Sequence, residues 1–350
     1  MIKFELSVAL IAISRLKGMG RKRVLDFLNE VYNRRGEYNF SYEDIVASKI
    51  STLKKLVDME LNETSWDFQC NKAREIIENS QKKGITTINF MDETYPKELF
   101  ILPVKPLVLF IKGKVELLMD EKKIAIIGTR NPSTFAKKMT PRITKQFSKL
   151  NYTVVSGLAL GCDTLAHEMA SIENGKTIAV LAHGLDMPVY PKQNRELAED
   201  ILRNGGVLVS EYPMGTKLRP SFLVERDEWQ SGMSLGTIMI ESSVNGGSRH
   251  ASFKAIEQQR ILGVLDHTQQ KNSNGLGIID RLDDSIGLNQ QLIMEKKAMP
   301  LYDLESIFTF NEQMLNIKEI VNTKANNLKL KEEKLTKDNV VQTSLFNQDY

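Results

Sequence analysis

Residues 124–130 read IAIIGTR, residues 153–167 read TVVSGLALGCDTLAH, and residues 175–186 read GKTIAVLAHGLD. Each stretch has a short apolar run that leads into a turn containing glycine, and helical patterns separate the three runs. Runs of this kind are typical of strands buried in a parallel sheet, whose carboxyl ends build a ligand crevice. The sequence therefore predicts an α/β fold with a mostly parallel sheet.

The turns after the first two runs have the residues that a phosphate-binding crevice requires. Gly128-Thr129 and Ser156-Gly157 are small enough for a ligand to approach the backbone, and the next helix offers free N–H groups at its start. Arg130 follows the first turn, where its planar guanidinium can contact two phosphate oxygens. An ion pair between Arg130 and a neighbouring carboxylate is the structural alternative.

The rest of the core continues the alternation of strand and helix. Strands are predicted at residues 84–88, 123–127, 152–156, 177–182, 206–210, 236–241 and 262–265. Helices are predicted at about residues 134–149, 163–173, 193–203 and 248–259. Pro141 lies inside the first of these helical patterns, so that helix is expected to kink or to begin late.

The sequence pattern of residues 1–62 predicts a small helical domain. Two helical patterns, 6–16 and 24–31, flank the basic segment KGMGRKR at residues 17–23, which is a helix-hairpin-helix arrangement. The hairpin's N–H groups and cations suit a DNA phosphate. A plain helical turn with a solvated basic surface is the alternative.

Composition limits the remaining possibilities. The chain has 350 residues, of which 41% are hydrophobic, and a net charge of +3, so any nucleic-acid site must be a local patch. The two cysteines, Cys70 and Cys162, have no metal-ligand spacing and fit a reducing cytoplasm. Neither a signal peptide nor a membrane span is predicted, so we expect a cytoplasmic protein with no membrane partner. Residues 316–341 are polar without a sustained apolar stripe, which predicts a linker or a marginal helix, and residues 309–350 are predicted to be a flexible tail.

Five motifs together resemble those of the DNA-processing protein A (DprA/Smf) family. In chain order they are IGTR, SGLALGCDTLAH, GKTIAVLAHGLD, VYPKQNRELA and LVSEYPMGT. The resemblance covers about residues 5–305. It implies an extended Rossmann fold at residues 63–308, preceded by a helix-hairpin-helix or SAM-like domain. It also implies a protein that binds single-stranded DNA without sequence preference during DNA processing, recombination or uptake, and that loads a RecA-type recombinase. We further predict a homodimer without enzymatic activity or cofactor.

The resemblance and the turns together give the predicted ligand-contact residues. Lys176 matches a basic position that the family uses near its DNA groove, although a solvated lysine is the alternative. Glu211 follows a strand end, where it would meet a sugar hydroxyl or orient Arg130. The full set is Gly128, Thr129, Arg130, Ser156, Gly157, Gly161, Lys176, Gly184, Glu211, Arg226, Ser231, Gly246, Gly247, Ser248 and Arg249.

Two segments depart from the family pattern. Residues 223–234 read LVERDEWQSGMS where the family has F-P-x-R-N-R-I-I-S-G-L-S, so Asp227 replaces an asparagine and Glu228 an arginine. Residues 245–251 read NGGSRHA, in which a glycine pair before a serine and a helix forms an anion nest. That nest resembles the nucleotide-binding G-G-x-G-T motif of the LOG phosphoribohydrolases. In those enzymes a nearby glutamate cleaves the glycosidic bond, and Glu257 lies too far along the following helix to match it. The alternative function is therefore a nucleotide-binding sensor or ribosyl hydrolase in stress or phage defence.

The C-terminal segment QTSLF at residues 342–346 resembles the peptide by which bacterial proteins bind the polymerase sliding clamp. Leu345 and Phe346 would enter an apolar pocket, and Gln342 would hydrogen-bond at its edge. Packing of these residues against the core, or no role at all, is the alternative.

Overall fold

The computed structural model describes residues 2–268 and 284–346, and it describes side-chain surroundings for residues 5–268 and 284–330. Within these residues one sheet of nine strands has the order β1-β2-β6-β5-β4-β3-β7-β8-β9. β1 and β2 pair antiparallel, β2 and β6 also pair antiparallel, and the other neighbours are parallel. The prediction of a mostly parallel α/β sheet is confirmed.

All the strands except β2 and β9, which were not among the predicted strands, follow the predicted apolar runs to within a few residues. Their bounds are β1 Ile85–Asn89, β2 Val108–Gly113, β3 Lys123–Ile127, β4 Thr153–Ser156, β5 Thr177–Val180, β6 Val207–Ser210, β7 Gly236–Met239, β8 Ile261–Leu265 and β9 Met299–Leu301. Every residue of β3 is buried because strands pair with it on both sides and helices cover both faces.

The order of the strands reverses beside β3. From β3 the chain moves outward through β4, β5 and β6 on one side, and then returns to place β7 on the other side. In open α/β sheets the crevice at such a reversal, outside the carboxyl ends of the strands, is where ligands bind. The structure therefore places the candidate crevice between the carboxyl ends of β3 and β7.

Helices cover both faces of the parallel strands. Their bounds are α6 Lys97–Phe100, α7 Thr134–Lys149, α8 Cys162–Glu173, α9 Arg195–Arg203, α10 Pro220–Gly232, α11 Ser248–Glu257 and α12 Gly287–Met294, with short 3-10 turns η1 Val115–Met119, η2 Lys192–Asn194 and η3 Asp284–Ile286. The side chain of Ser133 accepts a hydrogen bond from the N–H of Ala136 and caps α7, which spans Pro141 without beginning late.

The sequence did not predict α10. This helix has no apolar stripe, because several of its buried residues, including Arg226 and Gln230, are polar. Periodicity finds helices that bury apolar side chains against a core, and α10 instead buries polar groups beside the crevice.

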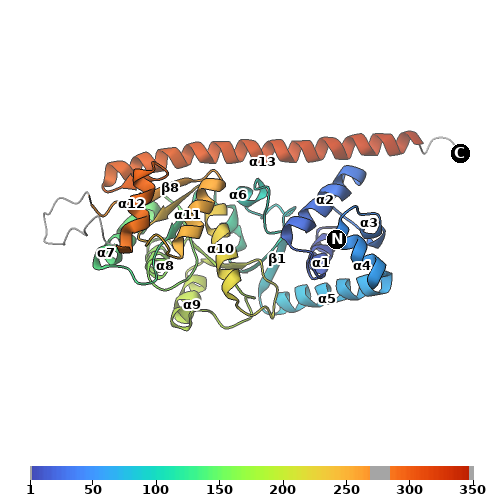
Figure 1. Ribbon diagram of the computed structural model, residues 1–350, viewed down its shortest axis with the longest axis horizontal. Coiled ribbons are helices and arrows are strands. Elements are labelled where there is room, and N and C mark those ends of the chain that lie inside the picture. The colour runs from blue at the N-terminus through green and yellow to red at the C-terminus, as the bar shows by residue number, and fades with distance from the viewer. Residues whose placement is uncertain (1, 269–283, 347–350) are drawn as a thin grey trace.

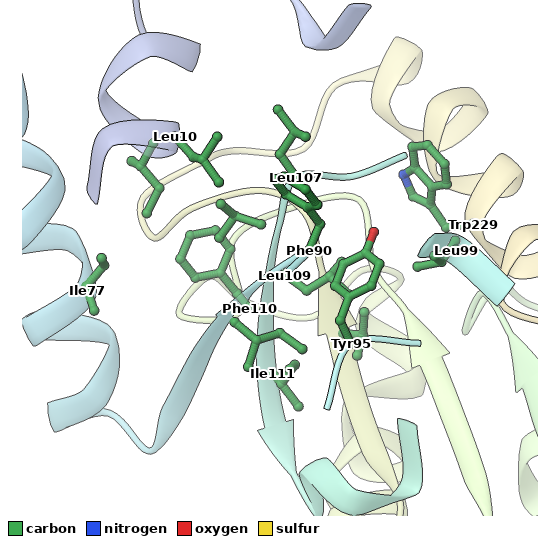
Figure 2. Close-up of a cluster of buried hydrophobic side chains, with 14 of the residues drawn as sticks. Leu10, Ile77, Phe90, Tyr95, Leu99, Leu107, Leu109, Phe110, Ile111 and Trp229 are labelled. Carbon is green, nitrogen blue, oxygen red and sulfur yellow. The ribbon is translucent and has the colours of Figure 1, made fainter. Parts of the chain in front are cut away.

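The N-terminal helices pack against the antiparallel edge of the sheet. They are α1 Ile2–Ser14, α2 Arg21–Arg35, α3 Tyr42–Val46, α4 Ser51–Met59 and α5 Glu63–Lys82. Figure 2 shows Leu10 of α1 and Ile77 of α5 in one apolar cluster with Phe110 and Ile111 of β2, and that cluster continues to Trp229 of α10. The helical region therefore shares a core with the sheet, while the domain boundary at residue 62 stays a prediction.

The prediction of a flexible tail at residues 309–350 is wrong as far as Phe346. Residues Leu304–Phe346 form one helix, α13, which runs along the length of the molecule in Figure 1. Phe310, Met314, Val321 and Ala325 are buried, and Phe310 contacts Phe147 edge to face. These apolar residues are spaced along one helix face, but a window that begins at residue 316 contains only two of them. The side chains of Gln342, Leu345 and Phe346 lie outside the described residues.

Candidate functional site

A cavity of about 350 Å³ lies at the reversal point of the sheet. Four segments line it: the turn after β3, the start of α8, the inner side of α10 and the turn before α11. The lining residues are Ile127, Gly128, Thr129, Arg130, Ala159, Asp163, Leu223, Arg226, Asp227, Gln230, Ser242, Ser243, Gly246, Gly247, Ser248 and Ala251. Its volume is near the lower end of the roughly 300–1,000 Å³ that ligand sites have, which suits one nucleotide unit.

The turn after β3 is held by its neighbours in an open, ligand-facing conformation. The N–H of Thr129 donates to the carbonyl of Glu241 at 2.8 Å, and the buried Glu241 carboxylate accepts hydrogen bonds from the N–H and hydroxyl of Ser133. Gly161 has φ +83°, and a Cβ there would lie 2.4 Å from the carbonyl oxygen of Thr129. Arg130 stays exposed at the cavity mouth. Glu241 was not among the predicted site residues, because it lies within the apolar pattern of a predicted strand.

Arg226 is a buried cation with unused donors. Its residue is 4% exposed, and its guanidinium lies against Gly157, where an added Cβ would be 1.3 Å from Nη1. Nε is 3.4 Å from Oδ1 of Asp227, but among the described residues neither Nε nor Nη1 has a hydrogen-bond partner. Since buried donors are normally paired, Arg226 has the character of a ligand-binding group.

Two carboxylates next to Arg226 have perturbed acidity. Asp163 accepts hydrogen bonds from the N–H groups of Gly157 at 3.0 Å and Ala159 at 3.3 Å, so it fixes the preceding turn rather than capping α8. Burial raises the pKa of Asp163 to about 6, opposed by the charge of Arg226. Burial also raises the pKa of Asp227, against the attraction of Arg226.

The start of α11 forms the opposite wall. A Cβ on Gly246 would lie 2.4 Å from the hydroxyl of Ser242, so this position requires glycine, whereas Gly247 is exposed with open space around it. Ser248 opens α11 at the cavity, where the helix N-terminus favours an anion. Arg249 points elsewhere: its guanidinium lies 4.6 Å over the ring of Phe253, and it is not among the cavity residues.

Several predicted residues lie outside the cavity. Lys176 precedes β5, at the amino edge of the sheet, where its Nζ is 3.2 Å from Oδ2 of Asp120. The hydroxyl of Ser156 donates to the carbonyl of Ile126, and the hydroxyl of Ser231 donates to Oε1 of Gln258. The prediction that these three residues lie in the crevice is therefore wrong, because the side chain of each contacts another part of the protein and none of them lines the cavity. Gly184 lies in the turn after β5, where an added Cβ would be 2.7 Å from the carbonyl of Pro213.

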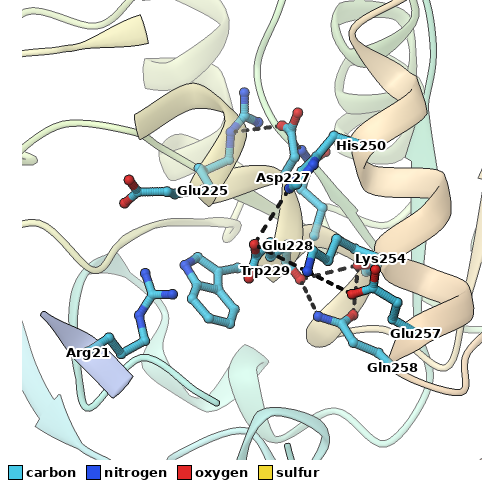
Figure 3. A network of polar contacts seen from close by, with 12 residues as sticks. Arg21, Glu225, Asp227, Glu228, Trp229, His250, Lys254, Glu257 and Gln258 are labelled. Atoms are coloured by element: carbon cyan, nitrogen blue, oxygen red, sulfur yellow. Dashed lines mark hydrogen bonds and ion pairs between the residues drawn. The ribbon is translucent and has the colours of Figure 1, made fainter. Parts of the chain in front are cut away.

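Glu211 joins the two parts of the molecule instead of contacting Arg130. Its carboxylate accepts two hydrogen bonds from Arg21 of α2, at 2.7 and 2.8 Å, and one from the indole N–H of Trp229 at 2.7 Å. The guanidinium of Arg21 also lies 4.4 Å from the centroid of the Trp229 ring. Figure 3 shows the two side chains next to each other. Arg21 came from the predicted phosphate-binding hairpin, so this cation is already used within the chain.

The substituted residue Glu228 faces α11. Figure 3 shows it opposite His250 and Lys254, whose nitrogens lie 3.5 and 3.7 Å from Oε1. Glu257 pairs with Lys254 on the exposed side of α11 and does not line the cavity. The contact between α10 and α11 therefore uses one of the two substituted carboxylates of α10, while the other, Asp227, lines the cavity.

Other kinds of site are not found in the described part of the chain. No group of three or more His, Cys, Asp or Glu side chains there is placed to hold a metal ion. None of the helices described combines the length and the apolarity of a membrane span.

Comparison with known sequences gives consistent matches. The family model for DNA recombination-mediator protein A matches residues 86–298. DNA processing protein DprA of Bacillus subtilis (strain 168) is 34% identical over 189 residues, which are 54% of this chain and 63% of that protein. Protein Smf of Synechocystis is 29% identical over 301 residues, 84% of this chain and 73% of that protein. The match thus spans less than two thirds of the Bacillus protein.

Two solved structures have a similar fold. DNA processing protein A from Streptococcus pneumoniae superposes with a TM-score of 0.65 at 23% identity, covering 87% of this chain and 95% of that one. DNA processing protein A from Helicobacter pylori, described for its single-stranded DNA binding mode, has a TM-score of 0.54 at 27% identity and covers 69% and 96%.

Proposed function

Because this chain belongs to the DNA recombination-mediator protein A family, we propose that it binds single-stranded DNA through the cavity between β3 and β7. The observation that carries the proposal is Arg226, a buried guanidinium with unused donors at the cavity wall. The Helicobacter pylori relative, described for its single-stranded DNA binding mode, supports the same ligand. The biological role we propose is DNA processing during recombination or uptake, without enzymatic activity.

The groups that line the cavity would contact different parts of the DNA. Arg130 at the mouth and the N-terminus of α11 at Ser248 favour phosphate oxygens. The backbone of Gly128 and Thr129 lies open to a close approach, and Arg226 supplies hydrogen bonds inside the cavity. Since the net charge is only +3, this local arrangement must supply most of the attraction.

The test is fluorescence anisotropy with labelled single-stranded and double-stranded oligonucleotides over a range of salt concentrations. For single strands, the logarithm of affinity is expected to fall with a slope of about −0.7 per phosphate contact. Arg130→Ala should weaken binding by about 1–3 kcal/mol and remove one contact from the slope. Lys176→Ala is the matched control, because it removes one positive charge at the opposite edge of the sheet. A flat salt response, or equal effects of the two variants, contradicts the proposal.

The cavity volume and the Gly246–Ser248 turn also favour a second candidate, a free nucleotide. A ribosyl hydrolase requires a carboxylate near the glycosidic bond, and Asp163 and Asp227 are the carboxylates lining this cavity. Calorimetry with nucleoside monophosphates tests binding, and chromatography of the same mixtures tests release of free base. Binding of mononucleotides without binding of oligonucleotides would replace the first proposal by this one.

Protein partners form a further part of the proposal. We propose a homodimer that delivers its DNA to a RecA-type recombinase, which light scattering and recombinase-loading assays test. The helix α13 ends at Phe346, so residues Gln342, Leu345 and Phe346 are at the end of the described backbone. For these we propose binding to the sliding clamp. Titration of the full chain against purified clamp, with Leu345→Ala and Phe346→Ala together as control, tests it; no difference between the chains removes the clamp.

A further inference from the structure

The inner side of α10 contains polar side-chain atoms that have no hydrogen-bond partner among the described residues. Gln230 is 2% exposed and lines the cavity, yet its Oε1 has no hydrogen-bond partner among the described residues. Its Nε2 donates to Oδ1 of Asp227 at 2.8 Å, and that contact fixes the orientation of the amide. For Oδ2 of Asp227, no hydrogen bond occurs within the described residues. With Nη1 of Arg226, α10 therefore offers one donor group and two acceptors.

Leaving such groups unpaired is expensive. A buried donor or acceptor without a partner costs about 1–3 kcal/mol, and native proteins have few of them. Three such atoms, without a partner in the described part of the chain, lie on α10, namely Nε and Nη1 of Arg226 and Oε1 of Gln230. Both residues border the same cavity as Asp227, whose side chain is 20% exposed. Unpaired groups gathered in this way are expected where a ligand supplies the missing partners.

The donor and acceptor pattern distinguishes the bases. Guanine has an acceptor at O6 and N–H donors at N1 and N2, which matches one guanidinium and two acceptor oxygens. Cytosine and thymine each bring two acceptors and a single donor group, and adenine has a single donor group beside ring acceptors. Each of these three would leave an oxygen of Gln230 or Asp227 unpaired, which is the basis of rejection in hydrogen-bonding sites.

We propose that this cavity selects a guanine base, read by Arg226, Asp227 and Gln230. The inference rests on the proposed function for its location, since it assigns the base while Arg130 and the start of α11 take the phosphates. The guanine can belong to a DNA strand or to a free nucleotide, which present the same edge. Asp227 is the residue that makes this chain distinct, because the family pattern has an asparagine there, and an asparagine would exchange the Oδ2 acceptor for a donor.

The experiment compares oligothymidylates that carry one central guanine, hypoxanthine, adenine or cytosine, with GMP and AMP as free ligands. We expect the guanine oligonucleotide to bind wild type about tenfold more tightly than the adenine and cytosine ones, and hypoxanthine, which lacks the N2 amine, to fall between. Asp227→Asn should reduce the preference below about threefold, because a donor then replaces the acceptor that the guanine amine requires. Glu225→Gln, a carboxylate change on α10 that lies outside this cavity, should keep the full preference.

Each outcome separates the two proposals. Equal affinity of wild type for all four oligonucleotides overturns guanine selection and leaves single-strand binding intact. Binding of GMP over AMP without binding of any oligonucleotide supports guanine selection and overturns the DNA proposal. Absence of both kinds of binding overturns both. If Asp227→Asn fails to fold, by thermal unfolding, the base series on wild type decides alone.

Discussion

Arg21→Ala tests the ion pair that joins the helical region to the sheet. The Arg21 and Glu211 side chains are 21% and 11% exposed. Removal of Arg21 leaves the Glu211 carboxylate without its ion-pair partner, although it keeps the hydrogen bond from the indole of Trp229. Such a change costs about 3–5 kcal/mol for fully buried pairs, and partial exposure of Arg21 places the expected loss near about 2–4 kcal/mol. The lost guanidinium–indole contact with Trp229 contributes about 0.5–1 kcal/mol of that loss.

The assay is urea unfolding followed by tryptophan fluorescence. The chain has two tryptophans: Trp66 lies in α5, and Trp229 lies at the ion pair itself. Glu211→Gln provides the second arm of a double-mutant cycle, because in that background Arg21→Ala should cost less than about 1 kcal/mol. Lys22→Ala is the control. Lys22 is adjacent to Arg21 but exposed, so this change should alter the free energy of unfolding by no more than about 0.5 kcal/mol.

One result refutes the reasoning. If Arg21→Ala and Lys22→Ala have the same free energy of unfolding within about 0.5 kcal/mol, the pair does not stabilise the junction. In that case the apolar cluster around Leu10 and Phe110 alone holds the helical region on the sheet.

Three further predictions use other features. Gly247→Val has open space, so it should keep the melting temperature but abolish binding if a ligand approaches the nest closely; normal oligonucleotide affinity would reduce the nest to a tight turn. Phe310→Ala should cost about 3–5 kcal/mol in urea unfolding because α13 packs this ring into the core, and a loss below about 1 kcal/mol would show a loosely held helix. For Asp163 the folded pKa of about 6 exceeds the ordinary value of 3.8, so protonation stabilises the folded state. That stabilisation is complete below about pH 4 and lost as pH rises through about 6, so the wild type should lose stability relative to Asp163→Asn over this range; parallel pH curves would contradict it.

The sequence by itself was enough for the parallel core. β3, β4 and β5 are continuous β-branched runs, and each is followed by a turn with glycine, so both the strands and the edge at which their turns meet follow from local chemistry. Gly128, Thr129 and Arg130 were predicted on the same basis and line the cavity, whereas Arg226 was predicted only from its match to the family pattern. Short-range pattern is sufficient here because a buried strand and a tight turn each constrain the identity of their own residues.

Tertiary structure decided which polar side chain meets which partner. Glu211 follows a strand end as predicted, but its carboxylate forms an ion pair with Arg21, which is distant in the sequence. Lys176 lies at the wrong end of its strand for the crevice, and α10 buries polar groups that no periodicity reveals. A charge or amide can be satisfied by any group that the fold brings within about 3 Å, so its role depends on long-range packing that spacing along the chain does not encode.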